Sequence, residues 1–164
     1  MFIKIENLPR KKLVGIQLKM SFNSIPRETV ALWKQFMPLR KFINNKVDSN
    51  LYSMQVYDGL LKMQEVKGTD EFTKWALVEV TDFENVPKTM NTFELDEGLY
   101  AVFLHKGLGS EFAKIINYIF GEWLPKSSYT LDHRPHFELL GAKYKNNDSS
   151  SEEEVWIPIK EKTI

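Results

Sequence analysis

The chain has 164 residues, which is enough for one domain with a substantial core and too few for two average domains. Hydrophobic residues make up 43% of the sequence and charged residues 27%, and the 22 basic residues balance the 22 acidic ones. This composition is typical of a globular protein and argues against direct binding of nucleic acid, which usually requires a basic surface, while the lack of cysteine excludes disulfides and thiolate metal sites.

The first half of the chain has the pattern of a strand, a helix and two further strands. Residues 13–22 alternate between apolar and polar, as in a half-buried strand. A serine cap and an early proline then precede apolar residues at helical spacing over residues 24–43, with a kink expected at Pro38. Residues 51–57 and 72–81 have the composition and alternation of strands.

The same order follows in the second half. Residues 99–106 are predicted as a strand, and a glycine pair then separates it from a helix with an apolar stripe over residues 110–123. Residues 135–140 and 154–160 are predicted as strands, joined by a polar hairpin loop at 146–153. This acidic loop is also a candidate contact for a basic partner.

Both halves of the chain therefore have the order strand, helix, strand, strand, and the two copies are offset by roughly 80 to 90 residues. We predict a single domain over residues 1–164 that contains internal repeats of about 10–86 and 92–164. Helices joined to antiparallel hairpins indicate an α+β fold, in which two helices cover one side of an antiparallel sheet. Because ligand pockets favour junctions between structural units, we expect a ligand cleft between the halves.

The sequence carries no sign of targeting or membrane insertion. Its first residues, MFIKIENLPRKK, lack the apolar core of a signal peptide, and no stretch approaches the roughly 18 apolar residues of a membrane span. The chain also begins almost at its first predicted strand, which leaves no room for an attached DNA-binding domain. We therefore expect a stand-alone cytoplasmic protein that contacts neither membranes nor nucleic acid directly.

One acidic residue, Glu138, interrupts the short apolar strand predicted near the end of the chain. Alternate side chains of a strand share a face, so Glu138 lies on the side of His136 and Leu140. A buried glutamate is rare unless it is paired, and an unpaired carboxylate in an apolar cleft is costly. A cationic ligand, an arginine or a lysine would offset this cost. The alternative is an exposed glutamate on an edge strand, paired with a neighbour such as Arg134.

Aromatic residues make up 13% of the sequence and are the second signal. Their rings build cores and ligand pockets alike, so each tryptophan has two interpretations. Aromatic walls around one acid suit a planar or cationic guest through stacking and cation–π attraction. The residues predicted for these walls are Trp33, Tyr52, Trp75, Tyr100, Phe103, Trp123 and Trp156, with Tyr57 and Tyr129 as further candidates.

The sequence contains no familiar catalytic or cofactor motif. A nucleophile elbow (GxSxG), a P-loop and a dinucleotide-binding GxGxxG are all absent. His133 and His136 lie three residues apart across a proline, but a zinc site needs three or four ligands and no third one has a suitable spacing. We therefore expect neither a metal nor a cofactor. One catalytic option is a general acid–base pair formed by a histidine and Glu138.

Three segments resemble a known family of small-molecule-binding domains. They are ELDEGLYAVFLHKG (residues 94–107), NYIFGEWLPKSSYTLDHRPHFE (117–138) and EEEVWIPIK (152–160), and the first half of the chain matches more loosely. The chain is similar to the gyrase-inhibitor-like (GyrI-like) domains, the same module as the effector-binding domain of AraC-type and MerR-type transcription regulators. The resemblance implies the duplicated SOUL/gyrase-inhibitor-like fold, with a ligand cleft between its halves.

The resemblance also implies roles for individual residues. Glu138 matches the acid of the family's cleft, which in multidrug-sensing members faces cationic, lipophilic aromatic compounds. Trp156 falls where the family often has a tyrosine, and Tyr100, Phe103 and Trp123 fall in segments that border the cleft. These residues are therefore expected to contact the ligand.

Three functions are consistent with these features. The first is a binding module for a hydrophobic, cationic or planar aromatic small molecule, with Glu138 as its polar anchor. The second is a small hydrolase of strained, electrophilic compounds, which some stand-alone members of the family resemble. In that case Glu138 would be the general base, assisted by Tyr57, Tyr52 or His136. The third is an inhibitor of a partner protein such as gyrase. We favour binding over catalysis. The family commonly has a tyrosine at the position of Leu140, so we expect an altered ligand preference.

Overall fold

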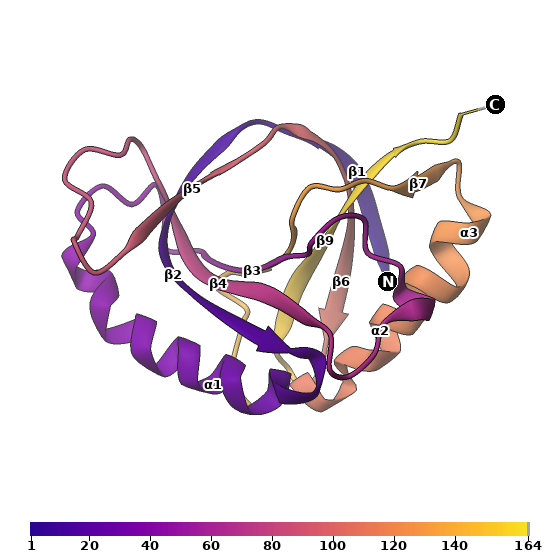
Figure 1. The fold of residues 1–164 in the computed structure, drawn as a ribbon, viewed down its shortest axis with the longest axis horizontal. Helices are drawn as coiled ribbons and strands as arrows, with labels where there is room; N and C mark the ends of the chain where they lie inside the picture. Colours follow the sequence, from indigo (N-terminus) through magenta and orange to yellow (C-terminus); the bar gives the residue numbers. More distant parts are fainter. Residues whose placement is uncertain (164) are drawn as a thin grey trace.

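The two halves of the chain form one curved antiparallel sheet, with helices α1 and α2 along one side of it (Figure 1). The computed structural model describes residues 1–163. The first half contributes β1 (Phe2–Leu8), β2 (Lys11–Ser21), α1 (Ile25–Phe36), β3 (Leu51–Val56) and β4 (Glu71–Val80). The second half contributes β5 (Asn91–Leu95), β6 (Gly98–Lys106), α2 (Phe112–Tyr118), α3 (Leu124–Lys126), β7 (Tyr129–Leu131), β8 (His136–Leu140) and β9 (Glu152–Glu161).

Each predicted strand and helix is present, and the two helices end differently from the expectation. Helix α1 ends at Phe36, and a 3-10 turn over Met37–Phe42 follows, because Pro38 cannot continue the regular hydrogen bonding. Helix α2 runs into a π-helical turn over Ile119–Trp123 and then into α3. Within the described part of the chain, every helix is too short or too polar to span a membrane.

The order of the strands reveals two interlocked units. Among the residues described, the strand order is β1-β6-β9-β8-β3-β4-β2-β5, and β7 pairs with β9 outside this order. The order β6-β9-β8 on one side of the centre mirrors β2-β4-β3 on the other, which is the arrangement expected of duplicated β-α-β-β units. The predicted α+β class with its duplicated architecture is thereby confirmed. Strands β1, β5 and β7 are additional, and β1 and β5 each pair with the opposite unit.

The face of the sheet that the helices cover is set by strand register. Ser53 on β3 lies opposite both Ala76 on β4 and Glu138 on β8, so these three side chains share one face. Apolar clusters beneath α1 and α2 hold the helices to this face, for example through Phe36 and Ile119. The central strands β3 and β8 therefore lie between the areas that the two helices cover.

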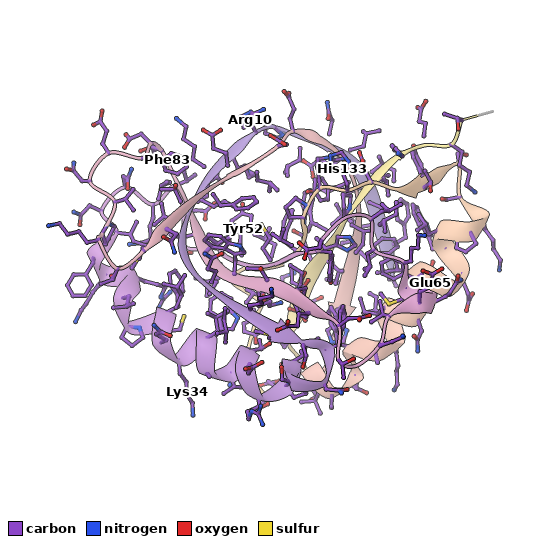
Figure 2. The ribbon with its side chains drawn as sticks, in the orientation of Figure 1. Arg10, Lys34, Tyr52, Glu65, Phe83 and His133 are labelled. Atoms are coloured by element: carbon purple, nitrogen blue, oxygen red, sulfur yellow. The ribbon has the colours of Figure 1, made fainter. Side chains whose placement is uncertain are left out.

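The opposite face is closed by the sheet itself. Strand β1 leads directly into β2, and β5 leads directly into β6. Leu8 of β1 pairs with Gly98, and Lys11 of β2 pairs with Leu95, so the two ends of the strand order lie next to each other. The strands arch over a third core cluster that is built from strand residues. Tyr52 belongs to this cluster and points into the arch (Figure 2).

Candidate ligand-binding site

A cavity of about 410 Å³ lies at the seam between the two units. Strands β3, β4, β8 and β9 contribute to its lining, α1 and α2 contribute further side chains, and the loop after β3 adds Leu61 and Met63. The cavity occurs here because each helix covers the strands of its own unit and leaves the junction open. The aromatic residues of the lining are Phe22, Trp33, Tyr57, Phe72, Phe112, Phe120 and Tyr144.

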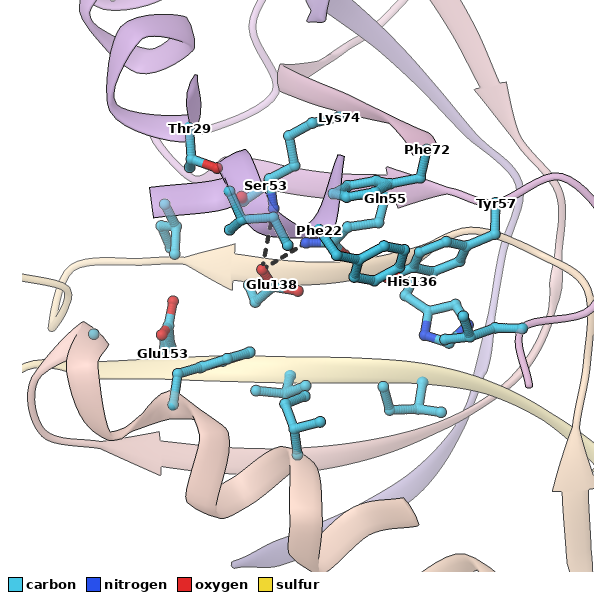
Figure 3. Close-up of a pocket in the computed structure, with 18 of the residues that line it drawn as sticks. Phe22, Thr29, Ser53, Gln55, Tyr57, Phe72, Lys74, His136, Glu138 and Glu153 are labelled. Atoms are coloured by element: carbon cyan, nitrogen blue, oxygen red, sulfur yellow. Dashed lines mark hydrogen bonds and ion pairs between the residues drawn. The ribbon is translucent and has the colours of Figure 1, made fainter. Parts of the chain in front are cut away.

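Glu138 accepts two hydrogen bonds at the centre of this cavity. Nε2 of Gln55 lies 2.9 Å from its Oε1 atom, and Nζ of Lys74 lies 3.4 Å from the same oxygen (Figure 3). The side chains of Lys74 and Glu138 are 7% and 12% exposed, so the two form an almost buried ion pair. Gln55 and Lys74 are direct partners in the register of β3 and β4, which places both on the face of Glu138. The carboxylate therefore has an internal partner.

A second acid, Glu153 on β9, lines the same cavity and points into it (Figure 3). Among residues 1–163 its carboxyl group has no hydrogen bond or salt bridge. Burial and, to a smaller extent, the negative charge of Glu138 together raise the pKa of Glu153 to about 7, against the opposing effect of Lys74. Near neutral pH, Glu153 is therefore present in both its protonated and its ionised form.

His136 and Tyr57 form one side of the cavity as neutral groups. Burial lowers the pKa of His136 to about 3, so its imidazole is uncharged at physiological pH. Burial and the charge of Glu138 raise the pKa of Tyr57, so its hydroxyl keeps its proton. The ring of His136 meets Tyr57 edge to face at 5.0 Å, and Tyr57 stacks on Phe22 at 6.1 Å. These contacts make an aromatic wall beside the ion pair.

The structure brings some of the predicted site residues together. Glu138 and Trp33 line the cavity, as does Tyr57, which was the candidate assistant for hydrolysis. The remaining predicted wall residues lie elsewhere in the core. Tyr52, Trp75, Tyr100 and Trp156 belong to the cluster inside the arch, on the far face of the sheet. Phe103 and Trp123 pack together under α2, with 5.1 Å between their rings. None of these six residues lines the cavity, so their contact with a ligand stays a prediction.

Sequence reasoning missed Lys74, Gln55 and Glu153. The signal for Lys74 was present, because it is a single charged residue within the apolar strand FTKWALVEV. Glu138 has the same feature, because it is also a single charged residue within an apolar strand. Glu153 was hidden in the acidic segment before the last strand, and β9 begins at Glu152, two residues earlier than predicted. Among residues 1–163 there is no cluster of three or more side chains suited to holding a metal ion.

A duplicated α+β domain with an aromatic cavity at its seam is the architecture of a small-molecule-binding domain. The chain belongs to the GyrI-like small molecule binding domain family, whose model matches residues 1–160. The resemblance drawn from the three sequence segments is thereby confirmed. The transcriptional regulator BrlR of Pseudomonas aeruginosa is 28% identical over 161 residues, which are 97% of this chain and 56% of BrlR. The chain thus spans about half the length of this curated relative.

Solved structures share the fold at low sequence identity. The structure of SAV2435 bound to tetraphenylphosphonium has a TM-score of 0.74 and 14% identity, with 98% of this chain and 94% of that chain covered. EcmrR in complex with DNA has a TM-score of 0.67 and 15% identity, with 97% and 57% covered. A hydrolase from Listeria innocua has a TM-score of 0.59 and 11% identity, with 96% and 91% covered.

Proposed function

We propose that this protein binds a hydrophobic small molecule, either cationic or planar and aromatic, in the cavity between its two units. The observation that carries the proposal is an aromatic-walled cavity that contains the almost buried ion pair of Lys74 and Glu138 and a second acid, Glu153. Its volume of about 410 Å³ is within the range of natural ligand pockets. The aromatic rings supply stacking surface, and the acids supply the charge that a cation would neutralise.

The charge balance of the cavity favours a cation over an anion. With both acids ionised, Glu138 and Glu153 contribute two negative charges and Lys74 one positive charge, while His136 is neutral. The lining then carries a net charge of −1, and the low dielectric of a buried site strengthens its effect. Each aromatic face that meets the cation adds about 0.5 to 2 kcal/mol. The ligand in the structure of SAV2435 is a lipophilic aromatic cation, which supports this choice.

Titration with tetraphenylphosphonium tests the proposal. Trp33 lines the cavity while Trp75, Trp123 and Trp156 do not, so ligand binding should quench the fluorescence of Trp33 in a saturable way. A Trp33→Phe variant should lose the quenching and still release heat on binding in calorimetry. Triphenylphosphine oxide, an uncharged analogue, should bind more weakly than the cation. The proposal fails if the wild-type protein shows neither quenching nor heat with the cation.

Hydrolysis of a strained, electrophilic compound is a second candidate, because Glu138 and Tyr57 line the same cavity. The carboxylate of Glu138 would take a proton from the attacking water, while the hydroxyl of Tyr57 would donate to the leaving oxygen. The likeness to a hydrolase from Listeria innocua is consistent with this candidate. Turnover of an aryl epoxide that Glu138→Gln abolishes, without loss of binding, would support it. Inhibition of a partner protein such as gyrase stays a prediction.

A further inference from the structure

The two acids of the cavity have different surroundings. Glu138 is held by Gln55 and Lys74, whereas the carboxyl group of Glu153 has no hydrogen-bond or ion-pair partner among residues 1–163 (Figure 3). Both side chains lie on the same face of the sheet, because Glu138 is paired in register with Val155, two residues from Glu153. One acid is therefore satisfied within the protein, and the other faces the cavity alone.

Lys74 is confined to this cavity by its place in the sheet. It lies in the interior of β4, and its neighbours on the same face, Phe72 and Ala76, are buried. Its ammonium group cannot reach bulk water except through the cavity, so its charge needs a counter-charge inside. Glu138 provides that counter-charge at 3.4 Å. While Lys74 is present, Glu138 is not free to neutralise a second cation.

We propose that Glu153, rather than Glu138, is the acid that a cationic ligand neutralises, and that Lys74 fixes this assignment by occupying Glu138. The inference rests on the proposed function, since it specifies which residue selects the charge of the ligand. Glu153 is then the specificity-determining acid of the cavity. Lys74 limits the affinity for cations, because it contributes a positive charge to the same space.

Cation binding should then release a proton. The charged and titratable groups that face Glu153 are Glu138 on β8, Lys74 on β4, His105 directly opposite on β6, and Tyr144 after β8. The helices α1 and α2 face the cavity with uncharged side chains. Because burial holds the pKa of Glu153 at about 7, the group is about half protonated at pH 7. An incoming cation stabilises the carboxylate, and the proton passes to solvent.

The pH dependence has a defined sign. If the cation binds only to ionised Glu153, its affinity falls about tenfold between pH 8 and pH 6, because protonated Glu153 must first lose its proton. Above pH 8 the affinity is constant. At pH 7, each bound cation releases about half a proton. An uncharged ligand of similar shape shows neither effect.

Calorimetry with tetraphenylphosphonium tests the inference, using two buffers of different ionisation enthalpy to count the released protons. The wild-type protein should release about half a proton per cation at pH 7. Glu153→Gln should release none and bind the cation about tenfold more weakly at pH 8, while binding triphenylphosphine oxide as before. Glu122→Gln removes an exposed acid outside the cavity and is the matched control.

A gain of affinity provides the second test. Lys74→Met keeps the length of the side chain, removes the positive charge and frees Glu138, so the cation should bind about tenfold more tightly. Glu153→Gln with wild-type affinity and proton release would overturn the inference and return the anchor role to Glu138. Absence of binding of either compound to the wild-type protein would instead overturn the proposed function.

Discussion

Lys74 on β4 and Glu138 on β8 form an ion pair across β3, with 3.4 Å between Nζ and Oε1. The lysine belongs to the first unit and the glutamate to the second, so the pair joins the two halves of the molecule at the cavity. Both side chains are almost buried, and removal of one partner leaves the other charge without compensation.

Replacement of one partner alone should destabilise the protein more than replacement of both. We expect Glu138→Gln to lower the free energy of unfolding by about 2 to 3 kcal/mol, because Lys74 keeps its charge without a direct partner. The double variant Lys74→Met/Glu138→Gln should recover part of this loss, since neither charge remains. Urea denaturation of both single variants and the double variant measures the coupling. Strictly additive losses would contradict the pairing.

Glu153 should make the protein less stable as the pH rises towards 8. Its pKa is about 7 in the folded protein against an ordinary value of 4.5, so between these values the folded state binds a proton that the unfolded chain has lost. Stability from this group is present below pH 4.5 and lost as the pH rises through 7. The advantage of Glu153→Gln over the wild-type protein should grow by about 2.5 kcal/mol from pH 5 to pH 8. Urea unfolding at the two pH values checks this, and Glu122→Gln should show no such growth.

Substitution of Trp156 should mainly reduce stability, whereas substitution of Trp33 should mainly reduce affinity for the ligand. Trp156 is 5% exposed in the core inside the arch, so Trp156→Ala should cost about 3 to 5 kcal/mol of stability. Trp33 lines the cavity and is only half-buried, so Trp33→Ala should lose clearly less stability than Trp156→Ala. Its loss of affinity for tetraphenylphosphonium should be the larger of the two. Thermal unfolding and calorimetric titration of both variants separate the two roles. Equal losses of stability would count against the placement of Trp33.

Gly15 should tolerate no side chain, because β2 approaches the backbone of β4 there. A Cβ atom at Gly15 would lie 1.9 Å from the carbonyl oxygen of Ala76, so Gly15→Ala must shift the strand that carries Lys74. We expect a loss of more than about 2 kcal/mol in the free energy of unfolding. The control is Gly121→Ala, where a Cβ would meet nothing within 4 Å in a helical segment and should be neutral or stabilising. Chemical denaturation of both variants decides the point.

The sequence alone predicted the main strands and helices and singled out one acidic residue of the cavity, Glu138. Alternation and helical spacing predicted the core strands and both helices, and the isolated Glu138 indicated a polar point in an apolar strand. The short edge strands β1 and β5 were missed, because pairing with the opposite unit depends on tertiary contacts that local pattern does not contain. The internal duplication predicted a cleft between the two halves, and the resemblance to the GyrI-like family implied the same position.

The aromatic walls were harder to predict, because both faces of the central strands are buried. Strand β4 is buried almost throughout, so its alternation does not reveal which side the helices cover. Tyr100 and Phe103 are three residues apart on one strand, so they cannot share a face, and they lie in different core clusters. The register between neighbouring strands cannot be read from the sequence. It is this register that places Lys74 and Gln55, rather than these aromatic rings, beside Glu138.

The exchange of β1 and β5 between the units has a consequence for how the chain folds. Each unit completes its part of the sheet with a strand from the other, and β1 pairs with β6 across about half of the sequence. Such distant pairings slow folding, because a long loop must close before the contacts form. If the chain is cut between β4 and β5, the first fragment keeps β1 but loses its β6 partner. The second fragment keeps β5 but loses its β2 partner. We therefore expect the repeats to fold together in a single cooperative transition, and the fragments to acquire structure only on mixing.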